Sequence, residues 1–223
     1  MNELIQLGSV KGYLSKPDEN GPWPAVIVIQ EWWGLDAQTK SIADRFAQEG
    51  YLAVAPDLYH GELAQLGDGD TAMKLVQKYG STAHLDLQSL FDVLKADPDC
   101  NGRIGSVGFC FGGRMSLTLS LSRPVDAVCT FYGGGMQTIF DQLRANLKAP
   151  VLGLFGDADV SIPAGTVEQF DKLLDDIGVE HEVVMYPNSG HAFFRDGDPN
   201  VYIPEASQDA WERVKKFFKK NLN

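Results

Sequence analysis

The chain has 223 residues, of which 44% are hydrophobic and 22% charged, which is enough for one domain with a sizeable core. Its formal net charge of −11 at pH 7 gives a surface that repels nucleic acid and anionic membranes, so neither is an expected partner. The start, MNELIQLGSVKGYL, lacks the pattern of a signal peptide, and no apolar run is long enough for a membrane span. With only three cysteines, we expect a cytoplasmic protein with free thiols.

Short apolar runs alternate with helical periodicities along the chain. In chain order, the sequence predicts a strand at 25–30, a helix through 42–47, a strand at 52–55, a helix at 83–95, a strand at 103–109, a helix at 111–121, strands at 125–132 and 151–155, a helix at 167–177, a strand at 182–186 and a helix at 206–218. This alternation predicts an α/β fold, with a mostly parallel sheet and helices on both faces. Residues 1–223 are expected to form a single domain, with a small covering excursion at about 60–80.

The motif with the clearest chemistry is GFCFGG at residues 108–113, which follows a predicted strand and precedes a predicted helix. A nucleophile in such a turn has a strained backbone, and its neighbours two positions away must be small because strand and helix approach closely. Gly108 and Gly112 meet this need on either side of Cys110. The free N–H groups at the helix start favour a thiolate. We therefore predict that Cys110 is a nucleophile rather than a buried structural cysteine.

A cysteine nucleophile needs a base and a group that orients the base. In the α/β-hydrolase arrangement the nucleophile, the acid and the histidine follow one another in that order. The turn GDAD after the 151–155 strand offers Asp159 as the acid, with Asp157 as a competitor in the same turn. The loop PNSGH after the 182–186 strand offers His191 as the base.

The loop QEWWG at residues 30–34 follows the first predicted core strand. A loop in this place supplies one N–H of an oxyanion hole, and the residue after the nucleophile supplies the other, which nominates the backbones of Trp32 and Phe111. Glu31 beside them would repel a thiolate if ionised, accept the thiol proton, or be a salt-bridged loop residue. Tyr132, at the end of the 125–132 strand, either borders the pocket or packs in the core.

Together these motifs resemble the dienelactone hydrolases (carboxymethylenebutenolidases) of the α/β-hydrolase fold over nearly the whole chain. The loop QEWWG resembles the Q-E-x-x-G loop of that family, and GFCFGG resembles its cysteine elbow. The turn GDAD with Pro163 resembles its acid turn, and GHAFFR resembles its histidine loop. The combination of the cysteine elbow with the Q-E loop makes the set specific.

The resemblance implies a triad of Cys110, His191 and Asp159. It also implies that Glu31 holds the resting thiol protonated until substrate binding moves it, and that Arg195 binds a substrate carboxylate. The chain departs from the family pattern near residues 72–75 (AMKL). Three residues there differ from the arginine, tyrosine and tryptophan of the family type: Gly69, Met73 and Val76. The predicted pocket is therefore less cationic and less aromatic.

The expected reaction is attack of Cys110 on the carbonyl of an ester or enol-lactone, giving a thioester that His191 and water release. No metal or organic cofactor is required, and the expected partner is a small-molecule ester or lactone substrate. The resemblance favours a monomer. Two alternatives remain open at this point: a ligand-binding or regulatory protein of the same fold with slow turnover, and a cysteine amidase or peptidase.

Overall fold

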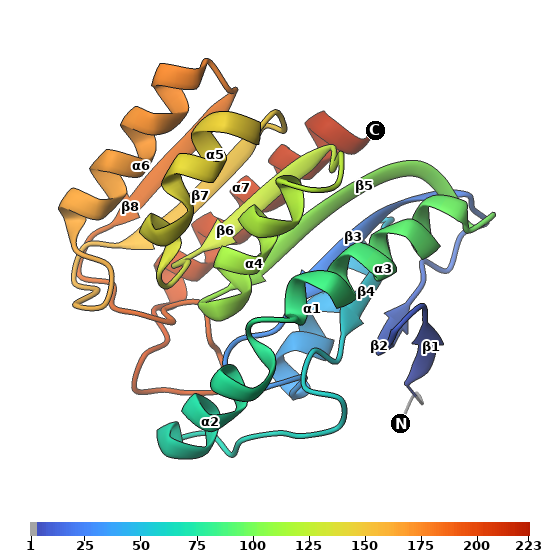
Figure 1. The fold of residues 1–223 in the computed structure, drawn as a ribbon, viewed down its shortest axis with the longest axis horizontal. Helices are drawn as coiled ribbons and strands as arrows, with labels where there is room; N and C mark the ends of the chain where they lie inside the picture. The colour runs from blue at the N-terminus through green and yellow to red at the C-terminus, as the bar shows by residue number, and fades with distance from the viewer. Residues whose placement is uncertain (1–3) are drawn as a thin grey trace.

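A single eight-stranded sheet runs through the computed structural model, which describes residues 4–223. In chain order the strands are β1 (Ile5–Leu7), β2 (Val10–Ser15), β3 (Trp23–Ile29), β4 (Leu52–Pro56), β5 (Cys100–Phe109), β6 (Ala127–Phe131), β7 (Val151–Gly156) and β8 (His181–Tyr186). Their order in the sheet is β1-β2-β4-β3-β5-β6-β7-β8 (Figure 1). Strands β3 to β8 pair in parallel, whereas β2 pairs antiparallel with both β1 and β4. The mostly parallel sheet is confirmed, and residues 1–3 of the predicted domain lie outside the described residues.

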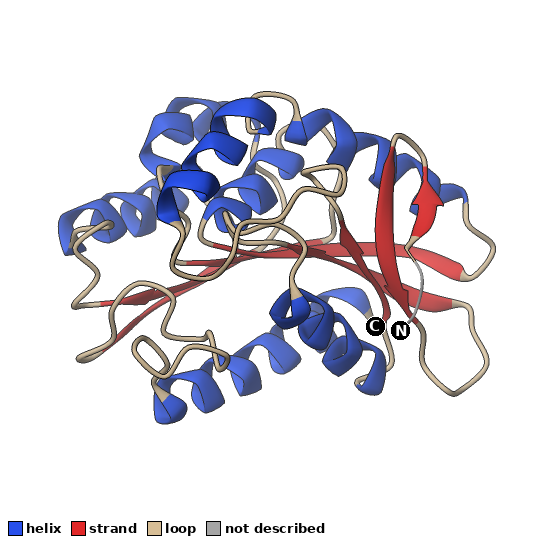
Figure 2. Cartoon of the chain, turned by 90° about the horizontal axis from the view of Figure 1, so that it is seen from below, coloured by secondary structure: helices blue, strands red, loops and turns tan. Residues whose placement is uncertain are grey.

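Helices cover both faces of the sheet, as predicted (Figure 2). They are α1 (Ala37–Gln48), α2 (Gly69–Tyr79), α3 (Ala83–Ala96), α4 (Phe111–Ser120), the 3₁₀ helix η1 (Met136–Ile139), α5 (Phe140–Asn146), α6 (Ala164–Ile177) and α7 (Pro204–Leu222). Helices α1 and α7 share one face, where the Phe46 ring lies 5.0 Å from Trp211 and 5.5 Å from Phe218. Within residues 4–223 no helix combines the length and apolar character needed to cross a bilayer.

The central strands form because their residues are apolar and often β-branched on both faces. Residues 25–29 of β3 (AVIVI) are completely buried, as expected for a strand covered by helices on either side. The same holds for β6 and β7, whose residues are all buried. Because these strands are parallel, their carboxyl ends meet at one edge of the sheet, and the loops that follow them can build a common site.

Five elements were not predicted individually: β1, β2, α2, η1 and α5. The edge strand β2 (VKGYLS) contains a glycine and an exposed lysine, so it lacks the continuous apolar run of a central strand. Helix α2 lies inside the expected excursion at 60–80 and begins after Asp68, which caps it by accepting a hydrogen bond from the Thr71 N–H. The Trp32 ring lies beside its first residue, since a Cβ on Gly69 would be 3.5 Å from that ring.

The backbone approaches very closely at the turn from β5 into α4. A Cβ built on Gly108 would lie 1.9 Å from the carbonyl oxygen of Gly112, and a Cβ on Gly112 would lie 2.4 Å from the carbonyl oxygen of Gln30. Both distances are shorter than atoms tolerate, so only glycine allows α4 to start this close to β3 and β5.

We expect Gly108→Ala to lower the free energy of unfolding by about 3 kcal/mol or more, because backbone cannot yield as a flexible side chain does. Gly165→Ala in α6 is the matched control, since its Cβ would meet no atom within 4 Å and helix propensity favours alanine. Urea unfolding measures both variants. Equal stability of the two proteins would contradict the close approach.

Candidate active site

Cys110 stands between β5 and α4 in a backbone conformation that side chains rarely adopt. Its φ is 54° and its ψ is −114°, and it is one of five non-glycine residues with positive φ in the described part of the chain. The surrounding backbone holds it there: the Cys110 N–H donates to the Phe131 carbonyl (3.1 Å), and its own carbonyl accepts from Gly113 and Gly134. Strain of this kind persists where neighbouring structure enforces it, and it clusters at functional sites.

The loops after β7 and β8 bring Asp159 and His191 together. His191 Nδ1 lies 2.7 Å from Asp159 Oδ2. The other carboxylate oxygen of Asp159 accepts from the N–H groups of Ser161 (2.8 Å) and Ile162 (3.2 Å), so the carboxylate is held in orientation. Asp159 is 4% exposed, whereas Asp157, the competitor in the same turn, is exposed. The structure thus places Asp159 rather than Asp157 against the imidazole.

The His191 ring connects the carboxylate to the thiol. Burial lowers the pKa of His191, but hydrogen bonds to Asp159 and to Cys110 outweigh it and raise the pKa to about 10. Since Nδ1 faces Asp159, the other ring nitrogen is the one left for the sulfur. The Tyr132 ring, 5.1 Å away between centroids, packs against the imidazole and helps to fix its orientation.

Glu31 is buried at the end of β3 and is tied to two side chains. Its carboxylate accepts from Arg195 Nη1 (2.8 Å) and from the Tyr132 hydroxyl (3.2 Å). Burial raises the pKa of Glu31, while the positive charge of Arg195 acts against that rise. Of the readings left open by the sequence, the structure shows the salt-bridged one in this conformation.

Arg195 is largely buried, with 7% of its surface exposed. Besides Glu31 it pairs with Asp36, the residue that caps α1 by accepting from the Thr39 N–H. We expected Arg195 to bind a substrate carboxylate, but in this structure its guanidinium already pairs with two carboxylates of the protein. The sequence analysis did not identify Asp36. Its only visible feature in the sequence was its position before a predicted helix, where an aspartate is a common N-cap.

The two candidate oxyanion donors come from different elements. Phe111 is the first residue of α4, and Trp32 lies in the turn after β3. In residues 4–223 neither backbone N–H donates to a protein acceptor. For Phe111 this is expected, because an N–H at a helix start has no partner within its own helix.

Tyr59, which the sequence analysis did not single out, also belongs to this region. It follows β4, is completely buried, and its hydroxyl has no hydrogen-bond partner. Burial and the nearby Cys110 both raise the pKa of Tyr59, and its ring lies 6.1 Å from that of Phe111. The visible signal was the polar segment PDLY directly after a buried strand.

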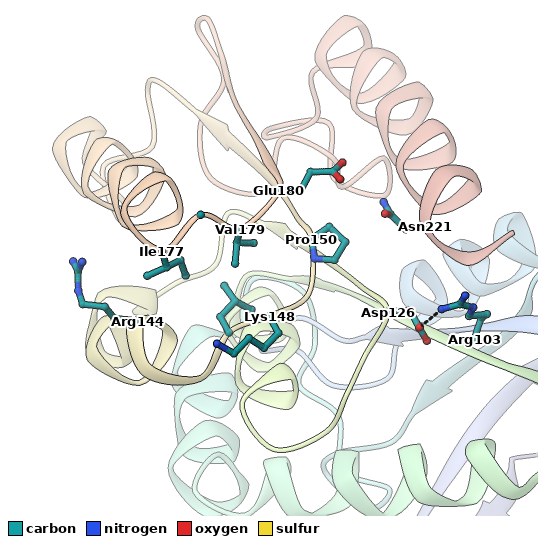
Figure 3. A pocket seen from close by; sticks show the side chains of 11 residues that line it. Arg103, Asp126, Arg144, Lys148, Pro150, Ile177, Val179, Glu180 and Asn221 are labelled. Carbon is teal, nitrogen blue, oxygen red and sulfur yellow. Dashed lines mark hydrogen bonds and ion pairs between the residues drawn. The ribbon is translucent and has the colours of Figure 1, made fainter.

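The cavity drawn in Figure 3, about 660 Å³, lies at the opposite ends of the strands. Its lining includes Arg103 at the start of β5 and Pro150 just before β7, and Arg103 is neutralised by Asp126 at 2.8 Å. None of its lining residues is a serine, cysteine or histidine, so it offers neither a serine or cysteine nucleophile nor a histidine base. In the described residues no group of three or more His, Cys, Asp or Glu side chains could hold a metal ion.

A family model, curated protein sequences and solved structures all match this chain over most of its length. The model of the "Dienelactone hydrolase family" matches residues 10–222. A protein of Methylorubrum extorquens that carries the name carboxymethylenebutenolidase is 34% identical over 96% of this chain and 78% of its own length. The "Protein usf" of Aquifex pyrophilus is 35% identical, covering 96% of this chain and 94% of its own. A Klebsiella pneumoniae crystal structure assigned as a dienelactone hydrolase has a TM-score of 0.84 at 32% identity, covering 94% of this chain and 92% of its own.

The raised pKa of His191 predicts a pH-dependent contribution to stability. A histidine whose pKa rises on folding stabilises the protein fully below its ordinary value of 6.5, and this stabilisation is lost as the pH rises through about 10. We expect the difference in unfolding free energy between wild type and His191→Gln to be constant below pH 6.5 and to shrink toward pH 10.

Urea unfolding at pH 6, 8 and 10 measures this difference. Asp159→Asn keeps a hydrogen-bonding group but removes the carboxylate charge. When His191→Gln is compared with His191 in that background, the difference in unfolding free energy should be lost at a lower pH than in wild type. A difference that has already vanished at pH 7 would mean that the imidazole is not held as the structure shows.

Proposed function

Because the chain belongs to the dienelactone hydrolase family, whose members are hydrolases of the ester and lactone class, we propose that it opens enol-lactones or cleaves activated carboxylic esters through Cys110, His191 and Asp159. One observation carries the proposal: a strained cysteine at the start of α4 shares a histidine with a buried, oriented carboxylate. Such an arrangement has the geometry of nucleophilic catalysis with an activated thiol.

The reaction proceeds in two halves. The Cys110 sulfur attacks the substrate carbonyl carbon while His191 holds the thiol proton, and the N–H groups of Trp32 and Phe111 bind the oxyanion. Collapse of this intermediate breaks the carbon–oxygen bond, and His191 returns its proton to the leaving oxygen. His191 then removes a proton from water, which attacks the thioester carbon. The carbon–sulfur bond breaks, the acid is released, and the proton on His191 returns to the Cys110 sulfur. Asp159 keeps the ring oriented and stabilises its positive charge.

In this proposal Glu31 keeps the Cys110 thiol protonated until substrate binds. Its bonds to Arg195 and Tyr132 keep a buried carboxylate in place near His191, whose positive charge lowers the pKa of Glu31. A substrate that disturbs the Glu31–Arg195 pair would move this carboxylate away from the thiol, so that the thiol proton passes to His191 and Cys110 becomes a thiolate. The salt bridge thus serves as the restraint that substrate binding releases.

The segment at 60–80, including α2, is proposed to cover the site as a small excursion of one domain spanning 1–223. Contacts from both of its ends support this. Tyr59, just before the segment, stacks on Tyr79 of α2 with 5.6 Å between ring centroids, and Trp32 lies against Gly69. That the protein is monomeric and cytoplasmic stays a prediction.

We expect Cys110→Ala to abolish turnover of 4-nitrophenyl esters and of cyclic enol-lactones, because no other side chain replaces the nucleophile. Its fold should persist, since an alanine at this position removes only the sulfur. Cys129→Ala is the matched control, because Cys129 is buried in β6. Steady-state hydrolysis and circular dichroism measure the two effects.

Mass spectrometry of the wild-type protein, quenched during turnover, should find an acyl group on the peptide that contains Cys110. Turnover in Cys110→Ala close to that of wild type would refute the mechanism. A stable acyl adduct that is not released would identify a ligand-binding protein instead, and cleavage of amides as fast as esters would identify an amidase.

A further inference from the structure

The hydroxyl of Tyr59 is buried without a partner near the proposed nucleophile. The residue is completely buried, and its Oη has no hydrogen-bond partner within residues 4–223. Tyr132 is equally buried, but its hydroxyl donates to Glu31. A buried hydroxyl without a partner destabilises a folded protein, so its presence in a native structure points to a role outside folding. Tyr59 thus carries a donor that the fold itself leaves unused.

Two segments of the proposed site contact the Tyr59 ring. Strand β4, which Tyr59 follows, lies next to β3 in the sheet, so the loops after the two strands meet at one edge. A Cβ on Gly34, at the end of the QEWWG loop, would lie 3.3 Å from Tyr59 Cδ2. The ring centre is 6.1 Å from that of Phe111, the residue that follows Cys110. These contacts place the tyrosine beside the turn that carries the thiol.

The Tyr59 side chain is held in a fixed position. Its backbone N–H donates to Asp57 Oδ1 (3.3 Å), and the other oxygen of that carboxylate accepts from the Gly61 N–H (2.7 Å). The ring stacks on Tyr79 of α2, with 5.6 Å between the centroids and 22° between the planes. On a fixed ring the hydroxyl can change only its O–H rotation, so the donor is preorganised.

Charge on the Cys110 sulfur acts on the Tyr59 hydroxyl. Burial raises the pKa of Tyr59, and the negative charge of a Cys110 thiolate raises it further, so the hydroxyl keeps its proton and remains a donor. Within residues 4–223, His191 from the loop after β8 and Tyr132 after β6 also interact with Cys110. His191 takes the thiol proton, and Tyr132 is already bonded to Glu31. Of these three side chains, Tyr59 is the one with a free donor for the sulfur.

We propose that the Tyr59 hydroxyl donates a hydrogen bond to the Cys110 thiolate and so stabilises the reactive form of the nucleophile. This inference rests on the proposed function. In the resting state the thiol is hydrogen-bonded to His191. When the thiol proton moves to His191, the sulfur keeps the electron pair and becomes a charged acceptor, which binds a donor more strongly than a neutral one does. Rotation about the Cα–Cβ bond of Cys110, between its staggered positions, directs the sulfur to Tyr59.

Tyr59→Phe removes only the hydroxyl, and alkylation of Cys110 by iodoacetamide measures the effect without turnover. Because the thiolate is the form that reacts, the alkylation rate rises with pH toward a plateau. We expect the pH midpoint of this rise to be about one to two units higher in Tyr59→Phe than in wild type, since hydrogen bonds to charged groups are of that strength. Mass spectrometry of the peptide that contains Cys110 separates this reaction from that of Cys100 and Cys129.

Tyr79→Phe is the matched control, because it removes a hydroxyl that is bonded to Glu62 from a ring stacked on Tyr59. Its alkylation midpoint should equal that of wild type. Since Tyr59→Phe deletes an unpaired buried hydroxyl, its melting temperature should equal or exceed that of wild type. An unchanged midpoint in Tyr59→Phe, an equal shift in Tyr79→Phe, or a clear fall in the melting temperature of Tyr59→Phe would overturn the proposal.

Hydrolysis of 4-nitrophenyl acetate separates this inference from the proposed function. If wild type hydrolyses neither this ester nor enol-lactones, the proposed function fails, whereas a raised alkylation midpoint in Tyr59→Phe still supports the bond to the thiolate. In an active enzyme, kcat/KM of Tyr59→Phe at pH 7 should fall about tenfold. The loss should disappear above the raised midpoint, because the thiol is then ionised in both proteins. A loss that is constant across the pH range would refute the bond to the thiolate.

Discussion

The close approach of β5 and α4 is the constraint on which the rest of the structure depends. Two glycines allow the helix to begin against the backbone of its neighbours, and this forces Cys110 into its positive φ. Cys110 is partly exposed in this turn, and the N–H group of Phe111, the first residue of α4, has no acceptor within residues 4–223. The residues that contact the sulfur come from other strands, but they converge on a position that this turn defines.

A second organising feature is the way an acidic protein handles charge beside its nucleophile. Glu31 and Asp36 place two negative charges close together at this edge of the sheet, and Arg195 pairs with both. Buried ion pairs of this kind add little net stability, but removing one partner leaves an uncompensated charge. The group is therefore better understood as an electrostatic setting for the cysteine and histidine than as a support for the fold.

Much of this could be predicted from the sequence, and what could not has physical reasons. The central strands were visible because both faces are buried, as in residues 25–29, whereas β2 lies at an edge and mixes exposed with buried residues. Cys110, His191 and their acid stood in turns with recognisable glycines. The turn GDAD alone could not decide between its two aspartates, because the choice depends on which one points back toward His191. Asp36 and Arg195 lie far apart in the chain, so their pairing needed the folded structure.

Strand β8 forms one edge of the sheet, pairs only with β7, and is only partly buried along most of its length. The loop that follows it carries His191, while Asp159 belongs to the loop after the better covered β7. Edge elements open at a lower free energy than the core. Local opening of β8 would move the imidazole of His191 away from the Asp159 carboxylate while the core stays folded. On warming, the enzyme should therefore lose catalytic activity at a lower temperature than that of global unfolding.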